Sequence, residues 1–241
     1  MPLQFDGRGI LLDIEGTTSP IAFVYDVMFP YVRQHLATFL QSHFDDDQTR
    51  AACDQIARDA GHASLNDWLP QADRAALMVA VKDEVTRLMD GDVKATGLKS
   101  LQGLIWKDGF TSGEMKARVF ADVVEALRRW ASQGRDVRIY SSGSITAQKL
   151  FFGYSEHGDL LSYFRDHFDT TTGPKREVRS YELIRESFEL PAESILFLSD
   201  VVAELDAARS AGMHTGLVVR PGNPAVEDDH THPVLTSFDG L

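Results

Sequence analysis

Cysteine and basic residues are both scarce in this chain. Cys53 is the only cysteine among 241 residues, so an internal disulfide and a cysteine-based zinc site are both excluded. The 24 Lys and Arg residues are outnumbered by 36 Asp and Glu, which gives a net charge of −12 and a pI near 5.0. Nucleic acids and anionic membranes are bound by clustered basic residues. We therefore expect neither of them as a partner.

Long hydrophobic runs are also missing. No uncharged apolar run approaches the roughly 20 residues that span a bilayer, and the mean hydropathy is −0.20. The first residues lack the basic and apolar regions of a secretory signal. We expect a cytoplasmic protein that acts as a monomer. The hydrophobic fraction of 43%, with 14 Phe, is sufficient for one large domain or for a core domain with a smaller insert.

Several common functional motifs are absent or incomplete. We find no Walker loop and no dinucleotide fingerprint. The acidic run 45–47 lacks the glycine and distal glutamate of an EF-hand, so we interpret it as a solvated helix start. We expect His230 and His232 to lie in an exposed tail. Cys53 falls in a predicted helix, where we expect it to be a packing residue and not a nucleophile.

The first part of the chain predicts one strand followed by helices. The apolar run 9–14 is typical of a buried strand. Between about residues 22 and 133 the pattern is almost entirely helical. In this stretch we expect a kink at Pro30 and a helix that opens at Pro70. The expected helices cover residues 24–44, 47–60, 71–89 and 115–132.

After Gly134 strands and helices alternate. We expect strands over residues 137–140, 167–169, 194–198 and 215–219, with helices over 145–152, 177–188 and 201–211. This alternation predicts an α/β fold with a Rossmann-like parallel sheet. Residues 1–20 and 134–241 would form the core, and 21–133 a mainly helical cap insert with linkers. We expect loop after Pro221.

Polar and acidic residues follow the ends of three predicted strands. Ligands bind beyond the carboxyl ends of strands in such sheets, so we expect these residues to converge on one site. Carboxylates there suit Mg²⁺, a small-residue turn that opens a helix suits a phosphate, and a nearby lysine would balance the phosphate charge. The carboxylates are Asp13, Glu15 and Asp200, the turn begins at Ser141 and Ser142, and the cation is Lys175. The alternative interpretation is that each of these Asp and Ser side chains, taken alone, is an ordinary helix cap.

These residues make the sequence recognisable. It resembles the haloacid dehalogenase superfamily of phosphohydrolases, whose motifs match Asp13-Ile-Glu-Gly-Thr17, Ser141, Lys175, and Asp200 with Glu204. Most members have a second Asp where this chain has Glu15. Longer stretches are similar to the enolase-phosphatases of methionine salvage, which have Glu there. These stretches are residues 11–24, 139–144, 147–150 and 219–223.

The resemblance implies roles for individual residues. Asp13 would be the nucleophile that forms an aspartyl-phosphate, and Glu15 the general acid and base. One Mg²⁺ per subunit would be held by the Asp13 carboxylate, the Glu15 backbone carbonyl and Asp200. Ser141, Ser142 and Lys175 would bind the phosphate; Arg176 is an alternative for the cation.

The resemblance also implies a substrate. A phosphorylated diketone, 2,3-diketo-5-methylthiopentyl-1-phosphate, would be enolised and then dephosphorylated to an acireductone. Mg²⁺ or Lys175 would polarise the ketone, and the sequence identifies no clear base for enolisation, although Glu15 is one candidate. The cap would exclude water, with Phe23, Trp106 and Phe110 as candidates to pack the methylthio group or simply to form core. Another phosphatase of the superfamily, acting on phosphoglycolate or a sugar phosphate, is the alternative; a dehalogenase and a non-catalytic binding module fit the residue set less well.

Overall fold

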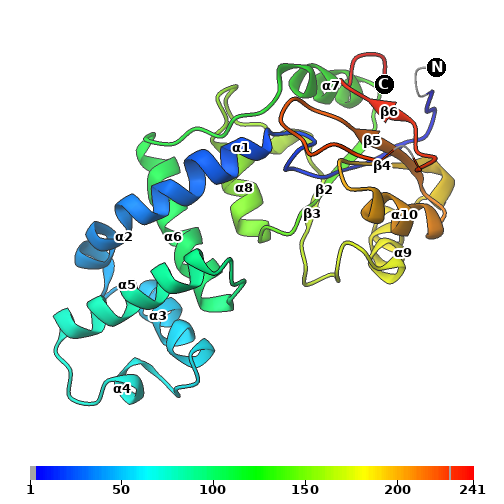
Figure 1. Cartoon of the computed structure of the whole chain (residues 1–241). Coiled ribbons are helices and arrows are strands. Elements are labelled where there is room, and N and C mark those ends of the chain that lie inside the picture. Colours follow the sequence, from blue (N-terminus) through cyan, green and yellow to red (C-terminus); the bar gives the residue numbers. More distant parts are fainter. Residues whose placement is uncertain (1–3, 228) are drawn as a thin grey trace. The chain divides into compact units, whose positions relative to one another are not determined.

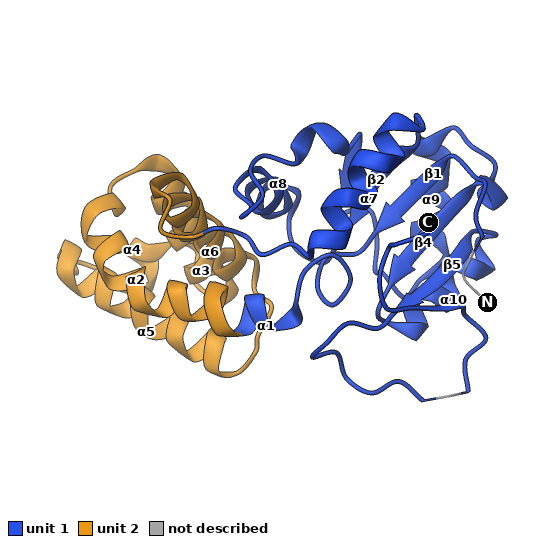
Figure 2. Cartoon of the chain, turned by 90° about the horizontal axis from the view of Figure 1, so that it is seen from above, with its two compact units in different colours: residues 1–25, 116–241 blue, residues 26–115 orange. Residues whose placement is uncertain are grey.

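The chain divides into two compact units, coloured separately in Figure 2. The structure is a computed structural model that describes residues 4–227 and 229–241. Unit 1 consists of residues 1–25 and 116–241, and unit 2 of residues 26–115. Helix α7 (Ala121–Ser132) belongs to unit 1, whereas our sequence-based boundaries set it in the insert. The functional division into a catalytic core and a cap stays a prediction.

Unit 1 is built on a parallel sheet of six strands in the order β3-β2-β1-β4-β5-β6 (Figure 1). This arrangement confirms the predicted α/β fold. The strands are β1 (Gly9–Leu12), β2 (Asp136–Tyr140), β3 (Asp166–Phe168), β4 (Ile195–Ser199), β5 (His214–Val218) and β6 (Val234–Leu235). The last one corrects our expectation of loop throughout the tail, because Val218 of β5 pairs with Leu235.

Helices cover both faces of this sheet, as parallel strands require. Successive side chains of a strand point to opposite faces, and Leu11 of β1 packs into the core cluster under two helices, α9 and α10. Figure 1 shows α7 on the other side of the sheet. The unit 1 helices besides α7 are α1 (Ile21–Phe23), α8 (Ile145–Gly153), α9 (Val178–Phe188) and α10 (Val202–Ser210), with 3₁₀ turns over Leu161–Tyr163 and Ala192–Ser194.

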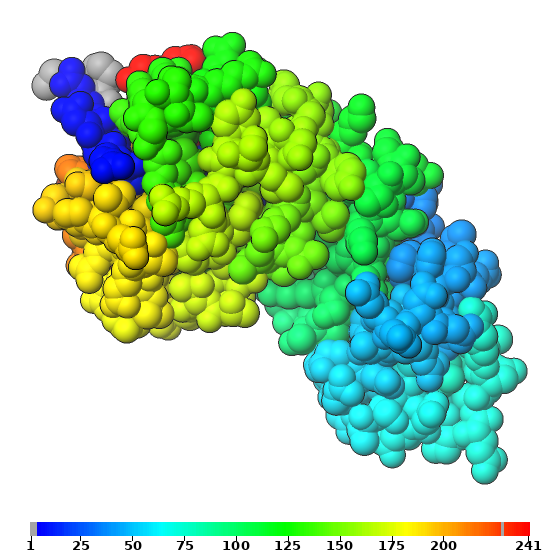
Figure 3. All heavy atoms as spheres, turned by 180° about the vertical axis from the view of Figure 1, so that it is seen from behind, coloured from blue at the N-terminus to red at the C-terminus, as the bar shows by residue number. Residues whose placement is uncertain are grey.

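The outer side of α9, coloured yellow in Figure 3, carries a surface network of charges. The guanidinium of Arg179 lies 2.9 Å from Glu182 and 3.8 Å from Glu186. Such exposed pairs contribute little to stability. The inner side of the same helix supplies buried Tyr181 and Ile184 to the core. Helix α9 is therefore amphipathic, and its inner side is held by packing against the sheet.

Unit 2 is a helical bundle with its own hydrophobic core, to which α2, α3, α5 and α6 contribute most of the buried residues. Helices α3 and α6 approach closely at Gly97 of α6. A methyl group added to this glycine would collide with the backbone nitrogen of Ile56 in α3. Cys53 is fully buried in this core, and burial raises the pKa of its thiol to about 12. This confirms it as a packing residue. The helices are α2 (Phe29–His43), α3 (Asp47–Asp59), α4 (Leu65–Trp68), α5 (Arg74–Asp90) and α6 (Thr96–Ser112).

Two expectations about proline in the helical stretch meet different outcomes, and the one about Pro70 is wrong. The helix after Pro70 begins at Arg74, because the Asp73 side chain caps it by accepting a hydrogen bond from the Ala76 amide at 2.8 Å. Pro30 lies inside a helical stretch that runs without a break from Ile21 to His43, because Met28 before α2 is itself helical. This stretch is irregular directly before the proline, where Val24–Met28 form a π-helix, and the expected kink stays a prediction.

The predicted helix over residues 115–132 begins only at Ala121. Helix α6 continues to Ser112 and stops at Gly113, which adopts φ +82°. The chain is then extended before α7 starts at Ala121, and this segment is held by tertiary hydrogen bonds. The Phe120 amide donates to the Thr18 carbonyl at 3.1 Å. Contacts with a segment about 100 residues away thus override the local helical pattern.

His232 is buried, which corrects our expectation of an exposed tail. Its Nδ1 lies 2.7 Å from the Thr215 hydroxyl and its Nε2 lies 3.1 Å from Asp206. Burial lowers the pKa of this histidine. The addition of β6 to the sheet returns the tail to the core, and His230 stacks on His232. Within the described ranges, none of the helices is long and apolar enough to cross a membrane.

Candidate functional site

The register of the sheet brings the predicted site residues to one edge. Leu12 of β1 pairs with Ile139 on one side and with Leu198 on the other. The residues that follow these positions therefore lie at the same level, at the carboxyl ends of three adjacent strands. They include Asp13 after β1 and Ser199, the last residue of β4. This is the convergence that the strand-end pattern predicts.

The loop after β1 holds Asp13 in place. The Asp13 side chain is almost fully buried, and its Oδ1 accepts a hydrogen bond from the Ile14 amide at 2.8 Å. The carbonyl of Ile14 accepts the amides of residues 17–19, which forms a compact turn. Gly16 makes this turn possible with φ +71°, a conformation that favours glycine.

Lys175 lies between two carboxylates. Its ammonium is 2.7 Å from Asp13 Oδ1 and 2.7 Å from Glu204 Oε2, and all three side chains are largely buried. Burial alone would lower the pKa of Lys175, but the two carboxylates outweigh it and raise that pKa. Lys175 is therefore a permanent cation beside Asp13. Arg176, the alternative for this role, is exposed.

Glu15 faces Ser141, the residue that follows β2. The Ser141 hydroxyl donates to Glu15 Oε2 at 3.2 Å and accepts the Gly143 amide at 3.2 Å. Burial and the nearby Asp13 carboxylate raise the pKa of Glu15. A carboxyl group with a raised pKa can donate a proton near neutral pH. Ser142 is exposed, and the two hydrogen bonds above are made by Ser141 alone.

Negative charge is in excess at the carboxyl end of β4. Burial, Asp13 and Glu204 together raise the pKa of Asp200 to about 7. Burial and Asp13 likewise raise the pKa of Glu204 to about 7, against the effect of Lys175. A divalent cation with oxygen ligands would relieve this repulsion. The donor chemistry around Asp13 and Asp200 therefore fits a hard cation.

Within residues 4–227 and 229–241, no group of three or more His, Cys, Asp or Glu residues has an arrangement able to hold a metal ion. The magnesium set implied by the sequence resemblance uses only two carboxylate side chains, those of Asp13 and Asp200, and adds the backbone carbonyl of Glu15. That set remains a prediction.

Sequence reasoning gave no role to three residues that lie at the candidate site. The Ser199 hydroxyl lies 3.0 Å from Glu204 Oε2 and 3.3 Å from Asp13 Oδ2. Glu204 belongs to the same resembling motif as Asp200, which was a usable signal for its place near the site. Asn223 donates from Nδ2 to the Gly16 carbonyl at 2.9 Å. No local pattern reveals this contact, because it joins residues more than 200 positions apart.

The three aromatic candidates are packing residues within their own units. Phe23 is buried in unit 1 and makes an edge contact with Phe151 at 5.8 Å between ring centroids. In unit 2 Phe110 is buried, and the Trp106 indole donates to the Met28 carbonyl at 2.9 Å. These environments favour the core interpretation, and contact with a methylthio group stays a prediction.

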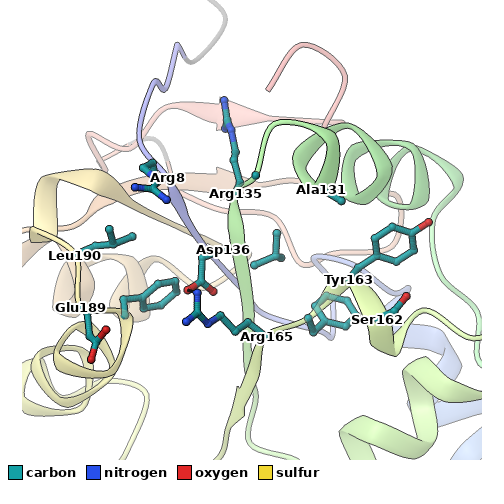
Figure 4. Close-up of a pocket in the computed structure, with 13 residues that line it drawn as sticks. Arg8, Ala131, Arg135, Asp136, Ser162, Tyr163, Arg165, Glu189 and Leu190 are labelled. Carbon is teal, nitrogen blue, oxygen red and sulfur yellow. Dashed lines mark ion pairs between the residues drawn. The ribbon is translucent and has the colours of Figure 1, made fainter.

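A cleft of about 600 Å³ lies at the opposite end of the sheet (Figure 4). Its lining includes Arg8, Asp136 and Arg165, which are at or just before the amino ends of β1, β2 and β3. Arg165 lies 3.5 Å from the Asp136 carboxylate. The close-up in Figure 4 shows these two side chains directed toward one another. None of the predicted site residues lines this cleft, so it is separate from the candidate active site.

Comparison with known structures defines the class of protein. No family model matches the chain. The putative HAD-hydrolase YfnB from Bacillus subtilis, bound to magnesium, is similar with a TM-score of 0.56 and 14% identity, over 96% of this chain and 95% of that one. The UTR4 protein from Saccharomyces cerevisiae is similar with a TM-score of 0.78 and 36% identity, over 98% of this chain and 100% of that one. The fold is that of the haloacid dehalogenase (HAD) superfamily.

A curated relative narrows the class to one family. Enolase-phosphatase E1 from Synechococcus elongatus is 45% identical over 245 residues, which span all of both chains. Enolase-phosphatase E1 from Danio rerio is 42% identical over 97% of this chain and 94% of its own length. The chain belongs to the enolase-phosphatase E1 family.

Proposed function

We propose that this chain is a Mg²⁺-dependent, bifunctional enolase-phosphatase of methionine salvage. It enolises 2,3-diketo-5-methylthiopentyl-1-phosphate and then removes the phosphate to give an acireductone, 1,2-dihydroxy-3-keto-5-methylthiopentene. Identity of 45% with an enolase-phosphatase E1 over both full lengths supports this activity. The observation that carries the phosphatase chemistry is the ion pair of 2.7 Å between Lys175 and Asp13 at the carboxyl end of β1.

Asp13 is the nucleophile of the proposed phosphatase step. Its carboxylate attacks phosphorus, the bond from phosphorus to the ester oxygen breaks, and the electron pair leaves with that oxygen. Lys175, Ser141 and Ser142 neutralise or hydrogen-bond the phosphate oxygens, so that an anion can approach an anion. The product is an aspartyl-phosphate on Asp13.

Glu15 moves the protons in both halves of that step. With its raised pKa it is protonated often enough to give its proton to the leaving enolate oxygen. It then accepts a proton from the water that attacks the aspartyl-phosphate. The hydrogen bond from Ser141 fixes the direction of the Glu15 carboxylate. This hydrolysis releases inorganic phosphate and regenerates the free Asp13 carboxylate.

Enolisation precedes this chemistry on the same substrate. A base removes a proton from the carbon beside a carbonyl, and a positive group polarises the carbonyl oxygen. Lys175 is one such group within the chain; Glu15 is a candidate base. The Asp13 carboxylate, the Glu15 backbone carbonyl and Asp200 would hold one Mg²⁺, which supplies charge neutralisation and carbonyl polarisation when bound. That the chain acts as a cytoplasmic monomer with a water-excluding cap stays a prediction.

The decisive experiment offers the purified chain the diketone phosphate. Ultraviolet absorbance follows the enol, and an inorganic phosphate assay follows the second step. We expect both signals with Mg²⁺ and loss of phosphate release in a chelator. We also expect excess Ca²⁺ to inhibit, because its higher coordination number lets Asp13 bind the cation through both oxygens. Faster turnover of phosphoglycolate or a sugar phosphate than of the diketone phosphate would contradict the proposed substrate.

A further inference from the structure

The turn from Arg220 to Asn223 holds the loop that carries the candidate nucleophile. Arg220 Nε donates to the Thr17 carbonyl at 3.1 Å, and Asn223 Nδ2 donates to the Gly16 carbonyl at 2.9 Å. The Arg220 guanidinium is buried between the rings of Phe120 and Phe238, at 4.5 and 4.8 Å. It is a rigid support, because Asp122 and the Thr236 carbonyl accept from its remaining nitrogens.

The orientation of the Asn223 amide is fixed by its donors. Nδ2 faces two carbonyl oxygens, that of Gly16 and, at 3.3 Å, that of Val218. A flipped amide would set its oxygen against both of them, which is unfavourable. The Oδ1 atom therefore points away from these carbonyls. It is buried and has no hydrogen-bond partner within the described part of the chain. A buried acceptor without a donor is costly. We therefore expect a donor to bind beside Asn223 Oδ1 when the enzyme is active.

Asp200 lies on the same side of the loop as this oxygen. A methyl group on Gly16 would collide with Asp200 Oδ2 and would lie 3.2 Å from Asn223 Oδ1. Both oxygens thus face one side of the Gly16 backbone, where a side chain is excluded. When Asp200 is ionised, these are two acceptor oxygens side by side, and a donor between or beside them would stabilise both. A water molecule bound to a divalent cation is a strong donor, and Mg²⁺ keeps several such waters.

We propose that Asn223 is a positioning residue for the metal site, with Oδ1 accepting a hydrogen bond from a water ligand of the cation that Asp200 holds. This inference rests on the proposed function, since it assumes that a divalent cation binds at Asp13 and Asp200. The Nδ2 atom fixes the Gly16 carbonyl while Oδ1 receives the water. One amide thereby links the shape of the loop to the hydration of the cation.

Direct measurement of metal binding tests the proposal without substrate. Mn²⁺ serves as the probe, and electron paramagnetic resonance reports the free ion at pH 7.5. We expect Asn223→Ala to raise the Mn²⁺ Kd by roughly 10–100-fold, the usual effect of losing an outer-sphere partner. Asn223→Asp keeps an acceptor oxygen beside Asp200 and adds a negative charge. It loses the Nδ2 donor to the Gly16 carbonyl, so we expect its Kd to lie between that of the unchanged chain and that of Asn223→Ala. Asn66→Ala, at an exposed asparagine of unit 2, is the matched control and leaves Kd unchanged.

Each alternative gives a different result. A residue that only supports the loop through Nδ2 weakens Mn²⁺ binding equally in Asn223→Ala and Asn223→Asp, which overturns the proposal. An unchanged Kd in Asn223→Ala with a raised KM for the diketone phosphate assigns Oδ1 to the substrate and also overturns it. Circular dichroism checks folding. If Asn223→Ala is unfolded, Asn223→Asp replaces it, and a Kd more than about 100-fold above that of the unchanged chain overturns the proposal. If the unchanged chain itself neither binds Mn²⁺ nor releases phosphate, the proposed function fails instead.

Discussion

The ammonium of Lys175 lies 2.7 Å from Asp13 Oδ1, although the two residues are 162 positions apart in the chain. Both side chains are nearly buried. In the resting enzyme the lysine therefore neutralises the carboxylate that is expected to attack phosphorus. When a phosphate enters, the same cation is in place to neutralise it. This relationship is the basis of the predictions that follow.

Replacing Asp13 with Asn should abolish phosphate release and leave the fold intact. An amide is a poor nucleophile and a weaker ligand for a hard cation, so we expect a decrease of at least about 10³-fold. Phosphate release and the unfolding temperature are measured on the same preparation. Residual turnover above roughly a tenth of the original would remove Asp13 from the nucleophile role.

Replacing Glu15 with Gln should separate the two steps. Phosphate loss needs a proton on the leaving oxygen, so we expect its rate to fall by roughly 10²–10⁴-fold. Enolisation depends mainly on polarisation of the ketone and should slow much less. The enol phosphate then accumulates, which ultraviolet absorbance detects. A parallel decrease of both steps would instead identify Glu15 as the enolisation base, and no decrease would contradict its acid and base role.

Replacing Lys175 with Met should weaken both stability and catalysis. The change leaves Asp13 and Glu204 as buried carboxylates without their cation, and breaking such a pair costs about 3–5 kcal/mol of unfolding free energy. We expect urea unfolding to show this loss, and a second change of Glu204→Gln to restore part of it. Arg176→Met is the control, since Arg176 is exposed. If Arg176→Met lowers activity as much as Lys175→Met, the arginine shares the role.

Replacing Asp200 with Asn should stabilise the metal-free protein as the pH rises. The pKa of Asp200 is raised from 3.8 to about 7, so the folded state holds a proton that the unfolded state releases. The unchanged chain therefore loses stability between about pH 4 and pH 7, and the loss is constant above that range. In a chelator, the unfolding temperature of Asp200→Asn should exceed that of the unchanged chain, and this difference should grow from about pH 4 to about pH 7.

Magnesium and an exposed carboxylate provide the controls for that experiment. Added Mg²⁺ should stabilise the unchanged chain at pH 8 more than Asp200→Asn, because ligand binding to the folded state raises stability. Asp83→Asn, at an exposed position of α5, should show no such growth with pH. A constant difference between Asp200→Asn and the unchanged chain from pH 4 to 8 would contradict the raised pKa.

The sequence by itself determined the class of fold and the location of the site. Alternating strands and helices after Gly134 predict a parallel sheet, and acidic or hydroxyl residues at strand ends predict where ligands bind. Both are local patterns, because strand periodicity and strand ends are written in neighbouring residues. Asp13, Glu15 and Ser141 were identified in this way. Lys175 was also proposed from its loop, and the motif resemblance added the family and the preference for Lys175 over Arg176.

Only the tertiary structure decided which distant residues meet. It placed Lys175 beside Asp13 while Arg176 stays exposed, returned His232 to the core through β6, and delayed the start of the predicted helix to Ala121. It also brought Asn223 to the Gly16 carbonyl. These contacts join segments about 20 to 200 residues apart. Such pairings depend on how whole elements pack and on which buried polar groups find partners, and no window of adjacent residues encodes them.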